Sequence, residues 1–170
     1  SCTSGCGPED NPFGSIQAAL NEGNRLIVEG AATSALVRVA AGVYRERIFV
    51  FPDIRVLGAG AGATMLDATG QGRSAVIFAS GGTARPRRNF SVDGFTITGG
   101  SGFVSDPVVD TVAGGGIYIF GDAVVSNNAI VGNVLSGSRT DWNGAGIYVA
   151  YGRPIIAGNT IARNISRPPS

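Results

Sequence analysis

The chain of 170 residues contains no histidine, no lysine and only two cysteines. The absence of histidine excludes Ser-His-Asp and Cys-His nucleophilic sites and every His-ligated metal site. Cys2 and Cys6 are too few for a structural zinc site. They can form a small disulfide or one end of a longer bridge network, and Cys2 can alternatively be a bacterial lipid-anchor cysteine. No apolar run reaches 18 residues, so we expect no membrane span.

Charged residues are scarce as well, at 15% of the chain, and the formal net charge is only +1. A chain this close to neutral has no general attraction to nucleic acids or anionic bilayers, so we expect no nucleic-acid partner. The abundant residues are apolar ones, at 44%, and glycine, with 27 copies. This composition favours a strand-rich fold interrupted by glycine turns.

One segment near the start of the chain has a helical pattern. Ser15 is a suitable N-cap, and Ile16, Ala19 and Leu20 share one face at helical spacing. We therefore predict a short helix over residues 14–20, ended by Gly23, that covers the open first rung of the strands behind it. Short apolar runs of β character follow, each bounded by turn residues: 36–39, 48–50, 54–57, 64–66 and 75–78.

Repeated segments decide between a solenoid and a sandwich. Residues 114–119 return 30 positions later as residues 144–149, and residues 125–133 return 31 positions later as residues 156–164, with a weaker earlier copy at 92–100. A period near 30 residues with three strands per unit is typical of a parallel β-helix. The fold class that we predict is therefore all-β: a right-handed parallel β-helix, or solenoid, with a short N-terminal capping helix.

The repeats also predict which residues stack. Ile117 should point inward and lie below Ile147 in the next coil, about 4.8 Å away. Asn128 should lie under Asn159, and the same relation holds for Asn133 and Asn164. We expect these asparagines to adopt left-handed turn geometry and to pass side-chain amide bonds between coils, which makes them architectural.

Several segments resemble one known superfamily. Residues 15–20, 37–46 and 54–67 resemble the usual opening of right-handed β-helix, or pectin-lyase-like, proteins, which include the pectinesterases. The Gly-Gly-Gly-Ile-Tyr unit at 114–118 and the Ile-Ala-Gly-Asn unit at 156–159 are similar to repeats of bacterial surface β-helix proteins. The resemblance covers nearly the whole chain. It implies the β-helix fold and a secreted or cell-surface location.

Two stretches resemble pectinesterase motifs more narrowly. Residues 119–123 resemble Asp-Phe-Ile-Phe-Gly-Asn-Ala, and residues 152–154 resemble Gly-Arg-Pro-Trp. The nucleophilic aspartate of that family falls on Ile117, however, and its tryptophan falls on Ile155. A hydrocarbon cannot replace a carboxylate nucleophile, so pectinesterase activity is not expected.

The candidate site lies in two polar excursions from the repeat, residues 101–113 and 134–143. Insertions at equivalent positions of a solenoid emerge on one face, so Asp110 and Asp141 are expected to lie close together. Paired carboxylates can act as acid and base on a glycosidic bond or bind Ca²⁺; no other cofactor is expected. The expected sugar contacts are Trp142, Tyr118, Tyr148 and Arg139. The alternative is that the two aspartates are solvated turn residues and that Tyr118 stacks on Tyr148 as a packing ladder.

These observations lead to two hypotheses of function. The first is an extracellular or cell-surface module, structural, adhesive or carbohydrate-contacting, without a catalytic motif and with a polysaccharide or cell-surface glycan as its partner. The second is a polysaccharide lyase or glycoside hydrolase that acts on acidic polysaccharide through the loop carboxylates. We expect residues 1–13 to form an extension, residues 14–170 to form a single domain, and the native polypeptide to continue beyond Ser170.

Overall fold

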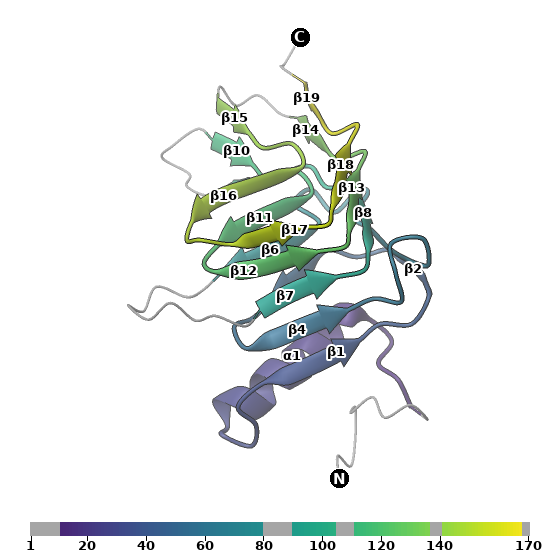
Figure 1. Cartoon of the computed structure of the whole chain (residues 1–170), viewed down its shortest axis with the longest axis vertical. Helices are drawn as coiled ribbons and strands as arrows, with labels where there is room; N and C mark the ends of the chain where they lie inside the picture. Colours follow the sequence, from purple (N-terminus) through teal and green to yellow (C-terminus); the bar gives the residue numbers. More distant parts are fainter. Residues whose placement is uncertain (1–10, 80–89, 105–110, 137–140, 168–170) are drawn as a thin grey trace.

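The computed structural model describes residues 11–79, 90–104, 111–136 and 141–167. Its strands are nearly all parallel and lie in stacked sheets, with one helix at the N-terminal end (Figure 1). Along the chain, the strands visit three sheets in turn and then return to the first sheet one position further up. We call each passage through the three sheets a coil. This arrangement is compatible with the predicted β solenoid.

The three main sheets contain most of the strands. Sheet A holds β1 (Ala35–Arg38), β4 (Ile54–Leu57), β7 (Phe90–Asp93), β12 (Ala123–Ser126) and β17 (Ile155–Ala157). Sheet B holds β2 (Gly42–Tyr44), β5 (Thr64–Asp67), β8 (Thr96–Thr98), β13 (Ala129–Val131) and β18 (Thr160–Ala162). Sheet C holds β3 (Ile48–Val50), β6 (Val76–Ala79), β11 (Ile117–Phe120) and β16 (Ile147–Tyr151).

Two smaller sheets contain the other strands of the described residues. One contains β9 (Phe103–Val104), β10 (Thr111–Ala113) and β15 (Asp141–Asn143), and in it only the β9–β10 pair is antiparallel. The other pairs β14 (Val134–Ser136) with β19 (Ile165–Arg167). Both belong to the later coils, which are therefore larger than the first ones.

The core consists of vertical columns of aliphatic side chains. Successive coils place like residue on like residue, because period-two alternation in each strand sends every second side chain inward. Ile117 pairs with Val76 below it and Ile147 above it, which confirms the predicted stacking. In sheet A, the column is Val37, Val56, Val92, Val125 and Ile156.

The stacked asparagines are also where the repeats predicted. The side-chain oxygen of Asn159 accepts the backbone N–H of Asn128 at 3.0 Å, and Asn164 accepts that of Asn133 at the same distance. The predicted left-handed geometry of these asparagines was wrong, because the residue before each of them has the positive φ angle instead: Asn127, Gly132, Gly158 and Arg163. The turn thus bends one residue earlier, which leaves each asparagine pointing along the stack.

The helix α1 (Ile16–Val28) closes the N-terminal end of the stack (Figure 1). Ser15 caps it as predicted, because its hydroxyl accepts the Ala18 N–H at 3.1 Å. The prediction that Gly23 ends the helix was wrong. Gly23 is buried inside it, where an added Cβ would lie 3.1 Å from the Cβ of Ala35. This glycine therefore allows close packing of helix on sheet rather than a helix end.

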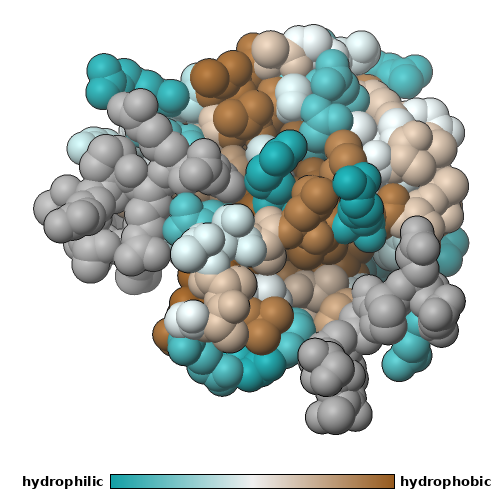
Figure 2. Space-filling view, turned by 60° about the horizontal axis from the view of Figure 1, so that its bottom comes forward, coloured by the Kyte–Doolittle hydropathy of each residue, from teal (hydrophilic) through white to brown (hydrophobic). Residues whose placement is uncertain are grey.

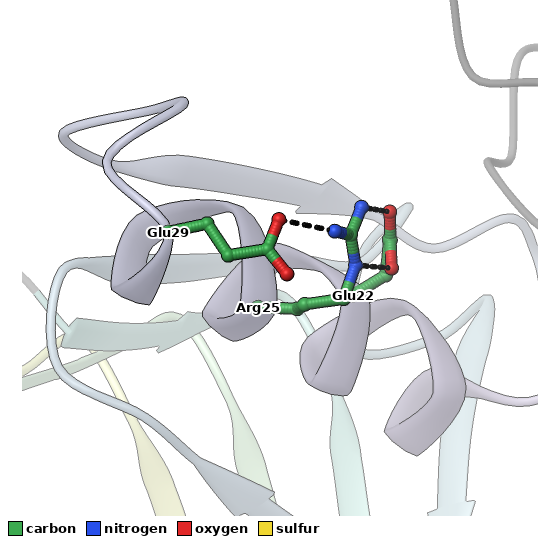
Figure 3. A network of polar contacts seen from close by, with 3 residues as sticks. All are labelled: Glu22, Arg25 and Glu29. Atoms are coloured by element: carbon green, nitrogen blue, oxygen red, sulfur yellow. Dashed lines mark hydrogen bonds and ion pairs between the residues drawn. The ribbon is translucent and has the colours of Figure 1, made fainter.

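The outer face of α1 carries an ion-pair network (Figure 3). Arg25 bonds Glu22 at 2.7 Å and also pairs with Glu29 one helical turn away. The hydrogen bond from Arg25 lowers the pKa of Glu22 below its usual value. Figure 2 turns this end of the molecule toward the viewer and shows hydrophobic residues interrupted by hydrophilic ones.

Gln17 protects the edge of the first strand of sheet C. The carboxamide oxygen of Gln17 accepts the backbone N–H of Phe49 at 2.7 Å, and its nitrogen donates to the Phe49 carbonyl at 3.4 Å. The side chain thereby substitutes for a missing neighbouring strand. Glu46 completes the junction by accepting the backbone N–H groups of Ile16 and Gln17 at 2.8 and 2.9 Å.

Replacing Gln17 with leucine should lower the free energy of unfolding by about 1–2 kcal/mol, because the part-buried Phe49 N–H loses its acceptor. Urea denaturation followed by circular dichroism measures the change. Gln71→Leu, at an exposed position of the same residue type, is the control and should change stability by less than about 0.5 kcal/mol. Equal stability of the two variants would contradict the role given to Gln17.

Candidate functional site

The two polar excursions meet as predicted, in the small sheet of β9, β10 and β15. Strand β10 pairs with β15 in parallel, with Thr111 opposite Asp141 and Val112 opposite Trp142. Asp110 and Arg139 lie outside the described residues, and Asp141 and Trp142 are placed here by their backbone alone. The proximity of the two carboxylates and their Ca²⁺ binding therefore stay predictions. Cys2, Cys6 and the predicted disulfide also lie outside the described residues.

Tyr118 and Tyr148 form a packing ladder on the outer face of sheet C. They are paired in register, and their ring centroids are 5.7 Å apart with a tilt of 39°. Tyr118 is only 6% exposed and packs in a small apolar cluster with Ile77 and Ala113. A ring with so little accessible surface has no free face for a sugar. Tyr148 is half-buried and retains some exposed surface.

A second aromatic pair is more accessible. The rings of Phe120 and Tyr151 stack at 5.5 Å, and these residues are 37% and 69% exposed. The repeat alignment places Phe120 beside Ala150, but the register shifts after Ile119 and brings Tyr151 into contact instead. This bulge explains why the sequence repeat did not indicate the pair.

The two stretches that resemble pectinesterase motifs lie one above the other next to this aromatic pair. The backbone N–H of Arg153 donates to Asp122 at 2.7 Å, and Gly121 donates to the Tyr151 carbonyl at 2.9 Å. Ile117, at the position of that family's nucleophile, is 0% exposed in the core. The stretches therefore contribute turn structure here, and the hydrocarbon side chain of Ile117 cannot attack a substrate.

A groove crosses the outer face of sheet A. It is half-open to solvent, and its volume is about 460 Å³. It extends over four successive strands, β1, β4, β7 and β12. The residues that line it are Leu36, Arg55, Val56, Leu57, Ser91, Asp93, Val124 and Ser126.

Strand register brings the polar residues of the groove together. Arg55 is opposite Ser91, and Asp93 lies between Leu57 below it and Ser126 above it. One oxygen of Asp93 accepts the Ser126 hydroxyl at 2.5 Å and the Asn127 amide at 2.8 Å. These two bonds hold the carboxylate in one orientation. Arg55 is exposed and supplies several N–H donors.

This arrangement suits a ligand with many hydroxyl groups. Arg55 donates hydrogen bonds, Asp93 accepts them, and the Ser91 hydroxyl can do both. The Ser126 hydroxyl already donates to Asp93 and can accept from a ligand. Leu36, Leu57 and Val124 provide apolar surface for C–H groups. Among the described residues that line the groove, Asp93 is the only carboxylate, whereas a glycoside hydrolase uses two.

The sequence repeats do not indicate this groove. Arg55 and Asp93 are 38 positions apart in the sequence, and their coils precede the clearest repeats. The weak copy at residues 92–100 contains Asp93, but as a repeat it predicts only the stacking of coils. A stronger signal was the alternation of Arg55 and Leu57 with buried Ile54 and Val56, which places Arg55 and Leu57 on the outer face.

In the described part of the chain, no three Cys, His, Asp or Glu residues come together as a metal site would require. Among the helical residues described, none forms a segment long and apolar enough to cross a membrane. Comparisons with protein-family models, with curated proteins and with solved structures found no match to this chain.

Proposed function

We propose that this chain is a right-handed parallel β-helix of the pectin-lyase-like type that binds a polysaccharide outside the cell or on its surface. The three parallel sheets visited in turn support the β-helix. Right-handedness is proposed because parallel crossover connections are right-handed in about 98% of cases. The module is structural or adhesive, and its contact with glycan does not involve catalysis.

The sheet A groove is the observation that carries this proposal. It combines a donor, Arg55, with an oriented acceptor, Asp93, and with two hydroxyl groups. Such mixed hydrogen bonding matches sugar hydroxyls better than it matches an apolar or purely anionic ligand. The four strands lie about 4.8 Å apart, so the groove offers repeated contacts to an extended polymer.

A binding role is favoured over catalysis by what the groove contains. Acid–base cleavage of a glycosidic bond requires two carboxyl groups about 5–9.5 Å apart, and the groove lining supplies one. The chain as a whole contains no histidine to serve as a general base in its place. The described lining of the groove can therefore orient a glycan without the pair of carboxyl groups that hydrolysis requires.

Arg55→Ala should weaken glycan binding about tenfold or more, because a hydrogen bond from a charged donor contributes about 1.5–3 kcal/mol. Calorimetric titration with pectate, alginate and a neutral glycan measures the affinity. Arg38→Ala is the matched control: Arg38 is an exposed arginine of the same sheet that does not line the groove. The Arg38→Ala variant should bind the glycan with the same affinity as the original chain.

Two results would contradict the proposal. The first is that none of the three glycans binds to the original chain. The second is that Arg38→Ala and Arg55→Ala weaken binding equally, since the effect would then be one of general charge. Circular dichroism spectra of both variants should match that of the original chain, which separates a lost contact from a lost fold.

A lyase or hydrolase acting on acidic polysaccharide is the second candidate function. The parallel pairing of β10 with β15 favours it, because it places Asp141 opposite Thr111, the residue after Asp110. The same incubations, assayed for new reducing ends and unsaturated uronates, test it directly. Cleavage that Asp141→Asn abolishes would establish the enzyme and overturn the non-catalytic proposal.

A further inference from the structure

The sheet A groove carries two opposite charges that do not pair with each other. Arg55 lies in β4 and Asp93 lies in β7, one coil higher and two positions beyond the residue opposite Arg55 (Figure 1). Such diagonal neighbours in a sheet lie about 7–8 Å apart. Among the described residues, ion pairs occur only on the outer face of α1. In this part of the chain, each charge of the groove therefore has no partner of opposite sign.

Hydrogen bonds explain why Asp93 does not turn toward Arg55. The carboxylate oxygen Oδ2 of Asp93 accepts the Ser126 hydroxyl at 2.5 Å and the Asn127 side-chain amide at 2.8 Å. Both donors belong to the coil above Asp93, whereas Arg55 belongs to the coil below it. The two bonds thus hold the negative charge away from the guanidinium group.

Each charge selects one kind of group on a ligand. A guanidinium group binds a carboxylate through two parallel hydrogen bonds, and a carboxylate binds an ammonium group through charge-assisted hydrogen bonds. Arg55 is the only cation among the described residues that line the groove, so it balances a single negative charge. A phosphate monoester carries a charge of about −1.5 to −2 and would leave an excess of negative charge near Asp93. The groove therefore favours a carboxylate at Arg55 over a phosphate.

We infer that the preferred ligand of the groove is a zwitterionic glycan, in which one sugar residue carries a carboxylate and a neighbouring residue carries an ammonium group. This inference rests on the proposed function and names the class of glycan. The carboxylate binds Arg55, and the ammonium group binds Asp93. Because these side chains lie on successive coils, about 4.8 Å apart along the stack, the glycan extends across the strands.

Glycans with charges of one sign match the groove less well. In a polymer of acidic sugars, a carboxylate bound to Arg55 brings the next carboxylate close to Asp93, and like charges repel. In a polymer of amino sugars, the ammonium group next to the one on Asp93 meets Arg55 with the same result. A neutral glycan avoids both repulsions but forms neither ion pair. The alternation of charge therefore distinguishes the preferred class from the others.

Four oligosaccharides of one backbone and equal length test this preference. The parent alternates glucuronate with N-acetylglucosamine and carries only carboxylates. Removing its acetyl groups gives the zwitterionic form. Reducing the carboxyl groups of the zwitterionic form leaves only ammonium groups, and reducing those of the parent gives a neutral chain. In calorimetric titrations at low ionic strength, the original chain should bind the zwitterionic form about tenfold or more tighter than each of the other three.

Substitutions assign each half of the preference to one residue. Arg55→Ala should bind the zwitterionic form no tighter than the form that carries ammonium groups alone. Asp93→Asn should bind the zwitterionic form no tighter than the parent. Asp93→Asn should also bind pectate, in which every residue is acidic, several times more tightly than the original chain does, because a repulsion is removed. A merely structural role of Asp93 would instead weaken the binding of pectate and of all four oligosaccharides.

Matched controls lie outside the groove. Arg38→Ala removes an exposed arginine of sheet A that does not line the groove. Asp67→Asn changes an aspartate of sheet B that also accepts a hydroxyl group, from Thr69 at 2.6 Å. Both variants should keep the preference of the original chain for the zwitterionic form.

The outcomes separate this inference from the proposed function. If the zwitterionic form binds no tighter than the forms with one sign of charge, while Arg55→Ala still weakens glycan binding, the inference is overturned and the proposed function stands. If the original chain binds none of the four oligosaccharides and neither pectate, alginate nor the neutral glycan, the proposed function fails and the inference fails with it.

Discussion

Replacing Gly100 with alanine is expected to lower the free energy of unfolding by about 4 kcal/mol or more, enough to prevent stable folding of many domains. A Cβ at this position would lie 1.9 Å from the Gly115 carbonyl oxygen and 2.8 Å from the Ala75 nitrogen. Both are backbone atoms: Ala75 lies in the coil below, and Gly115 lies in the same coil, just before β11. Neither can rotate away as a side chain does.

The backbone of Gly100 also cannot move to relieve the contact. Its N–H donates to Asn133 at 2.9 Å, and its carbonyl accepts the Val134 N–H at 2.9 Å. A shift that made room for a methyl group would break hydrogen bonds between coils. The cost of the substitution therefore combines steric overlap with unpaired buried polar groups.

Urea denaturation of Gly100→Ala and Gly62→Ala tests this expectation. An added Cβ at Gly62 meets nothing within 4 Å, and its φ lies outside the left-handed region, so alanine should be neutral there or stabilise by up to about 1 kcal/mol. If Gly100→Ala retained the stability of Gly62→Ala, the close stacking of coils at this position would be refuted.

Asn133→Ala is expected to cost about 3 kcal/mol of stability. Asn133 is 0% exposed, accepts the Gly100 N–H at 2.9 Å and donates to the Ile97 carbonyl at 3.1 Å. Truncation leaves both backbone groups buried without this partner, and each such group costs about 1–3 kcal/mol. Its bond to Asn164 at 2.9 Å is lost as well.

The control for this prediction is Asn24→Ala, which removes the same group from α1, outside the asparagine columns. Because alanine is the best helix former, this variant should match or slightly exceed the original stability. Thermal and urea unfolding of both variants give the comparison. A loss below about 1 kcal/mol in Asn133→Ala would mean that the asparagine columns are not important for stability.

The vertical register of the coils was predictable because it is a property of repetition. Residues 114–119 and 144–149 carry the same pattern of inward and outward side chains, and a slip by one residue would turn every inward residue outward. Only one pairing buries Ile117 and Ile147 together. The asparagine columns were predictable for the same reason, since Asn128 and Asn159 occupy equivalent places in the repeat.

Other features depended on contacts between segments without sequence similarity. Gly23 is predicted to end the helix, because glycine is a poor helix former. In the structure, the absence of a Cβ at Gly23 allows the helix to pack closely against Ala35. Tyr151 reaches Phe120 through a bulge that a regular repeat does not contain. Both outcomes were set by local packing that no spacing rule describes.

The sequence by itself determined the strand-rich character of the protein, the coil period and the residues that face the core, because these follow from the alternation and repetition of apolar side chains. Only the tertiary structure decided the groove around Arg55 and Asp93 and the contact between Phe120 and Tyr151. The physical reason is that these features arise where coils differ. Period and hydropathy specify what successive coils share, whereas a binding surface is formed by the residues that they do not share.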